Sequence, residues 1–238
     1  MIESIVIDPR FRGPPESGNG GYVAGLLGRY YRQAAVVTLR KPPPLGIQLT
    51  LAGHGTGHLR LLNDDELIAE SEPAQLELET PDPPDFDAAE RASRIYIGFD
   101  EHHFGGCFVC GPDRAAGDGL RIFAGALPGG HLVAAPWIPD RTLVDDTGQV
   151  RPEFLWAALD CPGYFALHMQ RPPSVMLLGR FEACVEPIVR ADEKCIVIGW
   201  PLGEESRKRY AGTALFSANG ELVGKARATW LTIDRRLW

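Results

Sequence analysis

The sequence lacks the features that mark membrane, secreted and nucleic-acid-binding proteins. It has no run of 18 or more apolar residues, and residues 1–13 lack the basic start and apolar core of a signal peptide. Lysine and arginine total 24 against 31 acidic residues, and no basic stripe with interleaved aromatic residues offsets the net charge of −7. We therefore expect a soluble, cytoplasmic protein with no nucleic-acid or membrane partner.

Cysteine is scarce, and its count of five is odd. Cys161, Cys184 and Cys195 lie in apolar stretches, where a reduced thiol packs as a small hydrophobic group, so we expect no disulfides. The other two cysteines belong to the segment CFVCGP, residues 107–112. Its C-x-x-C spacing also occurs in zinc sites and in redox pairs. The third possibility is that the two cysteines simply pack in the core.

Zinc requires four ligands, and His102, His103, Cys107 and Cys110 form a compact candidate set. Adjacent histidines point in different directions in most backbones, and no second pair of ligands follows at the usual spacing. A redox pair would need a βαβ context that is missing here. We therefore expect no metal and no cofactor, and we interpret the segment as the start of a domain, with Gly111-Pro112 turning the chain.

An internal duplication is the most informative feature of the chain. Residues 64–76 (DDELIAESEPAQL) align without a gap with residues 219–231 (NGELVGKARATWL). Each copy opens with a polar pair, Asp64-Asp65 or Asn219-Gly220, and then alternates in the manner of a strand. The two segments predict equivalent β-hairpins.

One helix candidate precedes each hairpin, at residues 21–35 and 153–169, and both are apolar on nearly every face, as buried helices are. β-rich runs follow each helix, and an acidic, proline-containing stretch separates the copies. The pattern predicts two domains, residues 1–80 and 104–238, joined by a linker at 81–103.

A long helix followed by an antiparallel meander, repeated in one chain, is similar to the double hotdog fold. Hotdog thioesterases often show the pattern H-G-G-x-x-x-x-L-x-D, in which the last residue is the catalytic acid. In the first half, Asn19-Gly20-Gly21 stands for the opening triplet and Gly28 falls at the position of the acid. In the second half, Arg151-Pro152-Glu153 replaces the triplet, whereas Asp160 keeps the acid.

Two further segments carry the resemblance. Residues 107–120 (CFVCGPDRAAGDGL) resemble the opening of many single hotdog acyl-CoA thioesterases, and residues 206–230 resemble the closing strands of bacterial members. The resemblance covers most of residues 104–238 and is weaker in the first half. It implies an α+β double hotdog, in which two central helices are wrapped by antiparallel sheets as a pseudo-dimer, and an acyl-CoA thioester hydrolase activity.

The resemblance also implies one composite site between the halves. The Gly20 and Gly21 N–H groups, with the Asn19 amide, would bind the carbonyl oxygen at a helix N-terminus, where backbone donors lack intrahelical partners. Asp160 would act as general base or nucleophile. The pseudo-symmetric site would be inactive, because Gly28 is not an acid and Pro152 has no N–H.

Plainer interpretations of these residues remain open. Asp160 is the only charged residue in FLWAALDCPGYFAL, residues 154–167, so it is either a perturbed acid in a cleft or a buried residue bonded to a neighbour. Asn19 is also a good N-cap residue, and Gly20-Gly21 also suits a tight helix start without a ligand.

Coenzyme A would bring phosphate groups, which basic side chains bind. Arg207, Lys208 and Arg209 form the densest basic cluster and are our candidates for substrate binding. The alternative is a solvated turn whose charges are balanced by Glu204 and Glu205.

Three functions follow from the resemblance. The first is hydrolysis of acyl-CoA or another acyl thioester, and the second is acyl-ligand binding without catalysis, which the incomplete motifs of both halves favour. An enoyl-thioester hydratase is a third, although the Asp/His pair typical of that activity is not recognisable here. Exposed sheet edges would also allow pseudo-dimeric chains to form a homo-oligomer.

Overall fold

The computed structural model describes residues 2–53, 57–169, 174–186 and 188–233. The first half contains η1 (Pro9–Phe11), α1 (Gly20–Gly28), β1 (Ile2–Val6), β2 (Ala35–Leu39), β3 (Gln48–Gly53), β4 (Leu59–Asn63) and β5 (Glu66–Pro73). Two helices follow, α2 (Phe86–Ser93) and η2 (Ile97–Phe99). The second half contains β6 (Gly125–Ala126), β7 (Val133–Trp137), η3 (Arg141–Leu143), α3 (Pro152–Ala158), α4 (Cys161–His168), β8 (Met176–Val185), β9 (Cys195–Glu205), β10 (Lys208–Ser217) and β11 (Leu222–Thr232).

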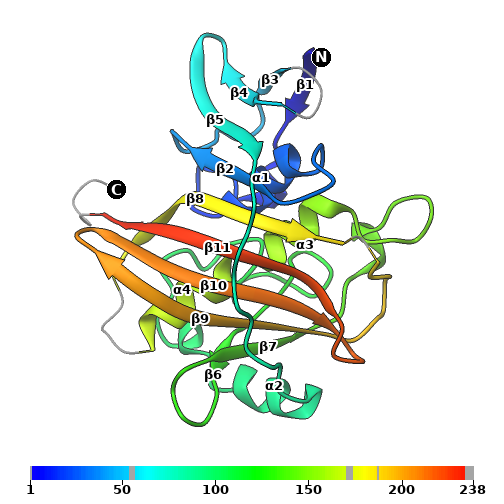
Figure 1. The fold of residues 1–238 in the computed structure, drawn as a ribbon, viewed down its shortest axis with the longest axis vertical. Coiled ribbons are helices and arrows are strands. Elements are labelled where there is room, and N and C mark those ends of the chain that lie inside the picture. The colour runs from blue at the N-terminus through cyan, green and yellow to red at the C-terminus, as the bar shows by residue number, and fades with distance from the viewer. Residues whose placement is uncertain (1, 54–56, 170–173, 187, 234–238) are drawn as a thin grey trace.

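The strands of the described residues form one 11-stranded antiparallel sheet in the order β1-β3-β4-β5-β2-β8-β11-β10-β9-β7-β6 (Figure 1). The centre is the pairing of β2 with β8, in which Val37 lies opposite Phe181. The strand order outward from this pair is the same on both sides: β5, β4, β3 and β1 beyond β2, and β11, β10, β9 and β7 beyond β8. The sheet therefore has the repeated arrangement that the duplicated sequence predicts.

Both predicted hairpins are present. Asn63 pairs with Glu66 across a two-residue turn, and Asp64 has a φ of 50°, as tight hairpin turns require. The second turn is longer than the sequence predicts, because Phe216 pairs with Leu222 and Gly220 takes the positive φ of 79°. β5 and β11 occupy equivalent places beside the central pair.

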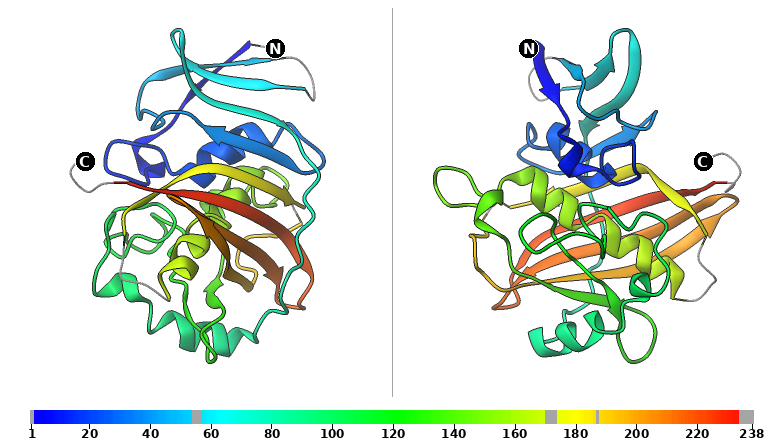
Figure 2. Two further views of the ribbon diagram at one scale, coloured as in Figure 1. Left: turned by 60° about the vertical axis from the view of Figure 1, so that its left-hand side comes forward. Right: turned by 180° about the vertical axis from the view of Figure 1, so that it is seen from behind.

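Helices α1 and α3 pack directly against each other on one face of the curved sheet (Figure 2). A row of glycines on α1 permits this contact. A Cβ atom at Gly25 would lie 2.6 Å from the Cα of Glu153, and one at Gly21 would lie 2.5 Å from the Cβ of Asp160. The two helix backbones thus approach more closely than larger side chains allow.

The helices are shorter than the sequence predicts. α1 ends at Gly28 rather than near residue 35, consistent with the low helix propensity of glycine. Instead of one helix at 153–169 there are two, α3 and α4, because Pro162 has no N–H and its ring would clash with a carbonyl of the preceding turn. At the break, the N–H of Gly163 donates to the carbonyl of Asp160 at 3.2 Å, and the carbonyl of Leu159 accepts a hydrogen bond of 2.7 Å from Thr213 Oγ1.

The segment between the halves crosses the outer face of the sheet, opposite the central helices (Figure 1). Lys225 Nζ on β11 donates to the carbonyl of Leu78 at 2.9 Å, and Arg227 donates to that of Glu77. The segment then forms α2, which the sequence does not predict. Ala89 and Ala92 bury one face of α2 against β6 and β7.

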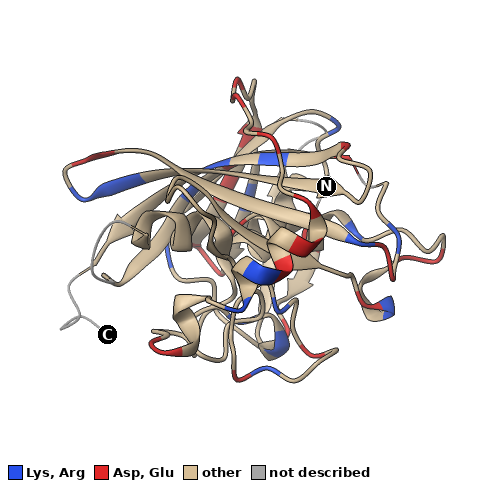
Figure 3. Ribbon diagram, turned by 90° about the horizontal axis from the view of Figure 1, so that it is seen from below, with Lys and Arg blue, Asp and Glu red and all other residues tan. Residues whose placement is uncertain are grey.

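Charges of both signs are interspersed over the surface seen in Figure 3. None of the helices in the described part of the chain is both long enough and apolar enough to span a membrane. All five cysteines are unpaired in this structure.

Candidate active site

A pocket of about 220 Å³ opens where the two halves meet. The first half contributes the start of α1, with Asn19 and Gly20, and the end of β2. The second half contributes the start of α4 and the inner faces of β8 and β11. The walls are mainly apolar and include Leu39, Phe165, Met176, Leu178 and Trp230. Such a pocket suits an apolar group with a few polar contacts at one end.

Asp160 lies in this pocket, at the break between α3 and α4, and its side chain is buried. Its Oδ2 accepts hydrogen bonds from Asn19 Nδ2 at 2.8 Å and from the N–H of Gly21 at 3.0 Å. No donor among the described residues reaches the other oxygen, Oδ1. The carboxylate is therefore fixed in orientation, with Oδ2 held by two donors and Oδ1 buried without a partner among the described residues.

Burial raises the pKa of Asp160 to about 7, against the lowering effect of the hydrogen bonds from Gly21 and Asn19. Desolvation dominates because the charged form loses its hydration and gains only two donors. A perturbed carboxyl group in a pocket is typical of functional sites.

Asn19 has two roles. Its Oδ1 accepts from the N–H of Tyr22 at 2.9 Å, so it is the N-cap of α1, while its Nδ2 binds Asp160. The N–H of Gly21 is directed at Asp160 rather than into the pocket. Gly20 begins α1, where no preceding helical turn supplies an acceptor for its N–H, and it lines the pocket. The structure thus brings Asn19, Gly20, Gly21 and Asp160 together, as the sequence predicts.

Known structures match the whole chain. A conserved protein with a hot dog fold from Alicyclobacillus acidocaldarius has a TM-score of 0.63 at 12% identity, over 98% of this chain and 93% of its own. The tesB protein of Mycobacterium avium subsp. paratuberculosis gives 0.62 at 11%, over 98% and 93%. Acyl-CoA thioesterase II TesB2 of Mycobacterium marinum gives 0.59 at 16%, over 100% and 94%. No family model matches the sequence, and no curated protein matches it.

The fold is the double hotdog. This confirms the fold predicted from the duplication and from the resemblance. At identities of 11–16% the similarity shows the fold alone, so the activity has to be argued from the site.

The pseudo-symmetric position of this double hotdog is filled. Gly28 occupies the place in the first half that Asp160 has in the second. A Cβ atom at Gly28 would lie 2.4 Å from Cζ2 of Trp156, so the indole ring takes the space of an acid. Glu153, the counterpart of Gly21, is buried beside Arg151, with 3.6 Å between Oε1 and Nε.

The predicted basic cluster lies at the β9–β10 turn of the double hotdog. Arg209 is bound to its own turn, through Glu204 at 3.1 Å and the carbonyl of Ser206 at 2.8 Å. Lys208 lies opposite Leu231, which lines the pocket, but the side chains of Arg207, Lys208 and Arg209 are not among the described pocket-lining groups.

Two other cations, Arg40 and Lys41, do line the pocket. Arg40 forms an ion pair with Glu70, and Lys41 lies 2.8 Å from Glu66 Oε1. Sequence reasoning missed both, because they form only an adjacent pair after a strand, whereas three consecutive cations stand at 207–209.

Three thiols line the pocket beside Asp160. Cys107 and Cys110, from the segment interpreted as a domain start, are buried and lie next to Cys161 at the start of α4. Hydrogen bonds with the Cys110 and Cys161 side chains hold the pKa of Cys107 well below its usual value, whereas burial raises the pKa of both Cys110 and Cys161. The sequence gives no sign of this grouping, because 50 residues lie between Cys110 and Cys161.

Proposed function

We propose that the protein hydrolyses acyl thioesters, with acyl-CoA as the substrate class, at one composite site per chain. The observation that carries the proposal is the geometry of Asp160. A buried carboxylate in an apolar pocket has one oxygen held by Asn19 and Gly21 and the other without a donor among the described residues.

The chemistry follows from this geometry. Oδ1 of Asp160 accepts a proton from a water molecule, which attacks the thioester carbonyl carbon. The carbonyl oxygen becomes an oxyanion, for which the N–H of Gly20 at the start of α1 is the candidate donor, because Gly20 lines the pocket. Collapse of the intermediate releases the thiolate, which takes up the proton. Asn19 and Gly21 act as positioning residues that orient the base.

The size and charge of the pocket suit an acyl thioester of coenzyme A. A volume of about 220 Å³ accommodates an acyl group with its thioester and leaves the nucleotide of coenzyme A outside. Arg40 and Lys41 at the pocket wall are better placed than Arg207, Lys208 or Arg209 to meet the phosphates.

A panel of short, branched, aromatic and long acyl-CoA substrates tests the proposal. We expect thiol release with at least one class, measured with a thiol-reactive dye. The matching N-acetylcysteamine thioester, which lacks the phosphates, should show a higher KM with a similar kcat, because it loses the cationic contacts. Saturable binding of acyl-CoA without thiol release across the whole panel would instead favour the non-catalytic binding protein.

Substitution of Asn19 separates its capping role from its role at the site. Asn19→Ser keeps a good N-cap oxygen, so the melting temperature should change little, but serine is too short to reach Asp160. We expect kcat to fall about tenfold or more, since a hydrogen bond to a charged group contributes about 1.5–3 kcal/mol. The measurement is kcat beside thermal unfolding, and an unchanged kcat with a lowered melting temperature would leave Asn19 as a cap alone.

A further inference from the structure

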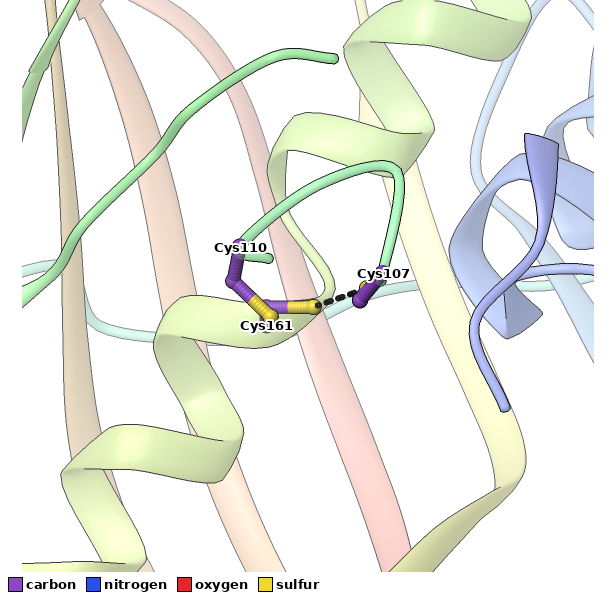
Figure 4. Close-up of side chains that lie close together, drawn as sticks. All are labelled: Cys107, Cys110 and Cys161. Carbon is purple, nitrogen blue, oxygen red and sulfur yellow. Dashed lines mark hydrogen bonds between the residues drawn. The ribbon is translucent and has the colours of Figure 1, made fainter. Parts of the chain in front are cut away.

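The sulfur atoms of Cys107, Cys110 and Cys161 all lie within 4.8 Å of one another. Figure 4 shows the three side chains converging, Cys107 and Cys110 from one loop and Cys161 from the first turn of α4. The Sγ atoms of Cys107 and Cys161 are 3.8 Å apart. All three residues are buried and line the pocket, so a ligand that enters the pocket reaches them.

These separations fit the ligands of a tetrahedral metal ion. Zinc binds thiolate sulfur at about 2.3 Å, so two sulfurs on one tetrahedral zinc lie about 3.8 Å apart. The distance between the sulfurs of Cys107 and Cys161 has this value, and the sulfur of Cys110 lies within 4.8 Å of both. Three protein ligands with a fourth position open to a pocket is also the usual arrangement of zinc sites that bind exogenous ligands.

The loop that carries Cys107 and Cys110 is built to keep the two sulfurs together. The N–H of Gly111 donates to the carbonyl of Cys107 at 2.9 Å, which closes a tight turn. A Cβ atom at Gly111 would lie 2.3 Å from the carbonyl oxygen of Gly105, so only glycine fits there. The hydroxyl of Tyr96 donates to the carbonyl of Cys110 at 3.0 Å and fixes the far side of the turn.

Hydrogen-bond donors surround the sulfurs, as thiolate ligands require. Nδ2 of Asn19 lies 3.9 Å from the sulfur of Cys107. Nε2 of His102 lies 3.4 Å from the sulfur of Cys110. Donors of this kind offset the negative charge that three thiolates bring to one metal ion.

His102 and His103 lie near the three thiols but are not ligands of the proposed metal ion. Nδ1 of His102 accepts the N–H of Phe104 at 2.9 Å, so the ring proton is on Nε2, which then donates to Cys110. Nδ1 of His103 lies 3.1 Å from the hydroxyl of Tyr164, away from the thiols. The set His102, His103, Cys107 and Cys110 considered from the sequence is therefore not the one that the structure assembles.

We propose that Cys107, Cys110 and Cys161 bind one zinc ion, with the fourth position open to the pocket and His102 as a supporting donor. Thiolate ligands select zinc over magnesium or calcium. The ion joins the loop at 107–110 to the first turn of α4, immediately after Asp160. Zinc binding is measured without substrate, so the proposal stands or falls separately from the hydrolase activity.

Metal content of the full chain tests the proposal. The protein, stripped with chelator under reducing conditions and given zinc, should retain about one zinc per chain after desalting, by mass spectrometry of the metal. Cys107→Ser, Cys110→Ser and Cys161→Ser should each lose it, whereas Cys184→Ser, which changes a half-buried cysteine elsewhere, should keep it. His102→Ala should keep the stoichiometry and weaken the affinity about 10- to 100-fold.

Because buried cysteine variants can fail to fold, the unmodified chain provides a second measurement. Cobalt added in place of zinc should give intense thiolate-to-metal absorption that zinc abolishes, and zinc should protect three of the five thiols from a thiol reagent. Folded protein that retains no zinc overturns the proposal. The proposal is also overturned if all three cysteine variants still bind zinc, or if the protein binds copper but not zinc. A disulfide between Cys107 and Cys161 under the same reducing conditions would overturn it as well.

Discussion

Asp160→Asn should lower kcat for acyl-CoA hydrolysis by about 10²- to 10⁴-fold, the usual contribution of a general base. Asparagine has nearly the same shape, and its carbonyl oxygen can accept the hydrogen bonds from Asn19 and Gly21 that Oδ2 accepts in the native protein. Its amide then replaces Oδ1, an atom without a donor among the described residues. The fold should therefore be retained while the proton acceptor is lost.

A matched control is available on the facing side of the pseudo-dimer. Glu153→Gln also neutralises a buried carboxylate next to a helix start, but in the half that Trp156 fills. It should leave kcat unchanged. Full activity of Asp160→Asn, measured beside circular dichroism and melting temperature, would remove Asp160 from the mechanism, and equal losses in both variants would indicate general damage.

Gly25→Ala should destabilise the protein by about 3 kcal/mol, the upper end of the cost of overpacking a core. The added Cβ would lie 2.6 Å from the Cα of Glu153 and 2.9 Å from its carbonyl oxygen. These are backbone atoms, so the clash is relieved only if α1 and α3 move apart. Urea unfolding followed by circular dichroism measures the change in the free energy of unfolding.

Gly163→Ala is the matched control for this change. It is also a buried helical glycine, but its added Cβ would lie 3.2 Å from the Cβ of Ala211 and 3.3 Å from Cγ2 of Thr213, tight but tolerable contacts. The stability should change by less than about 1 kcal/mol, because the gain in helix propensity offsets part of the crowding. If Gly25→Ala and Gly163→Ala lowered the stability by similar amounts, the close contact of α1 with α3 at Gly25 would not be the cause of the loss.

The fold was predictable because the sequence contains an internal duplication that the two halves of the fold share. The duplicated hairpin gave the two-fold order of the sheet, and the isolated charge of Asp160 in an apolar helix marked the residue that the structure places in the pocket. The break before α4 also had a visible signal, since Pro162 follows Asp160 by two residues. It was missed because continuous hydrophobicity suggested one helix.

Other features depended on tertiary contacts that no local pattern carries. Cys161 reaches Cys107 and Cys110 only because the loop and α4 meet at the junction of the halves. The Gly21 N–H was expected to face a substrate, but the close helix packing brings Asp160 against it. Arg207, Lys208 and Arg209 are prominent in the sequence, yet their position relative to the pocket depends on the length of the β9–β10 hairpin.

Trp156 and Gly28 show what joining the two halves in one chain makes possible. In a dimer of identical subunits, each substitution occurs at both symmetry-related positions, so a bulky ring that closed one site would close its twin. Here the two positions are encoded separately, and one has become packed core while the other retains Asp160. The filled position adds apolar contacts without removing the carboxylate, so one half of the molecule can evolve for stability and the other for chemistry.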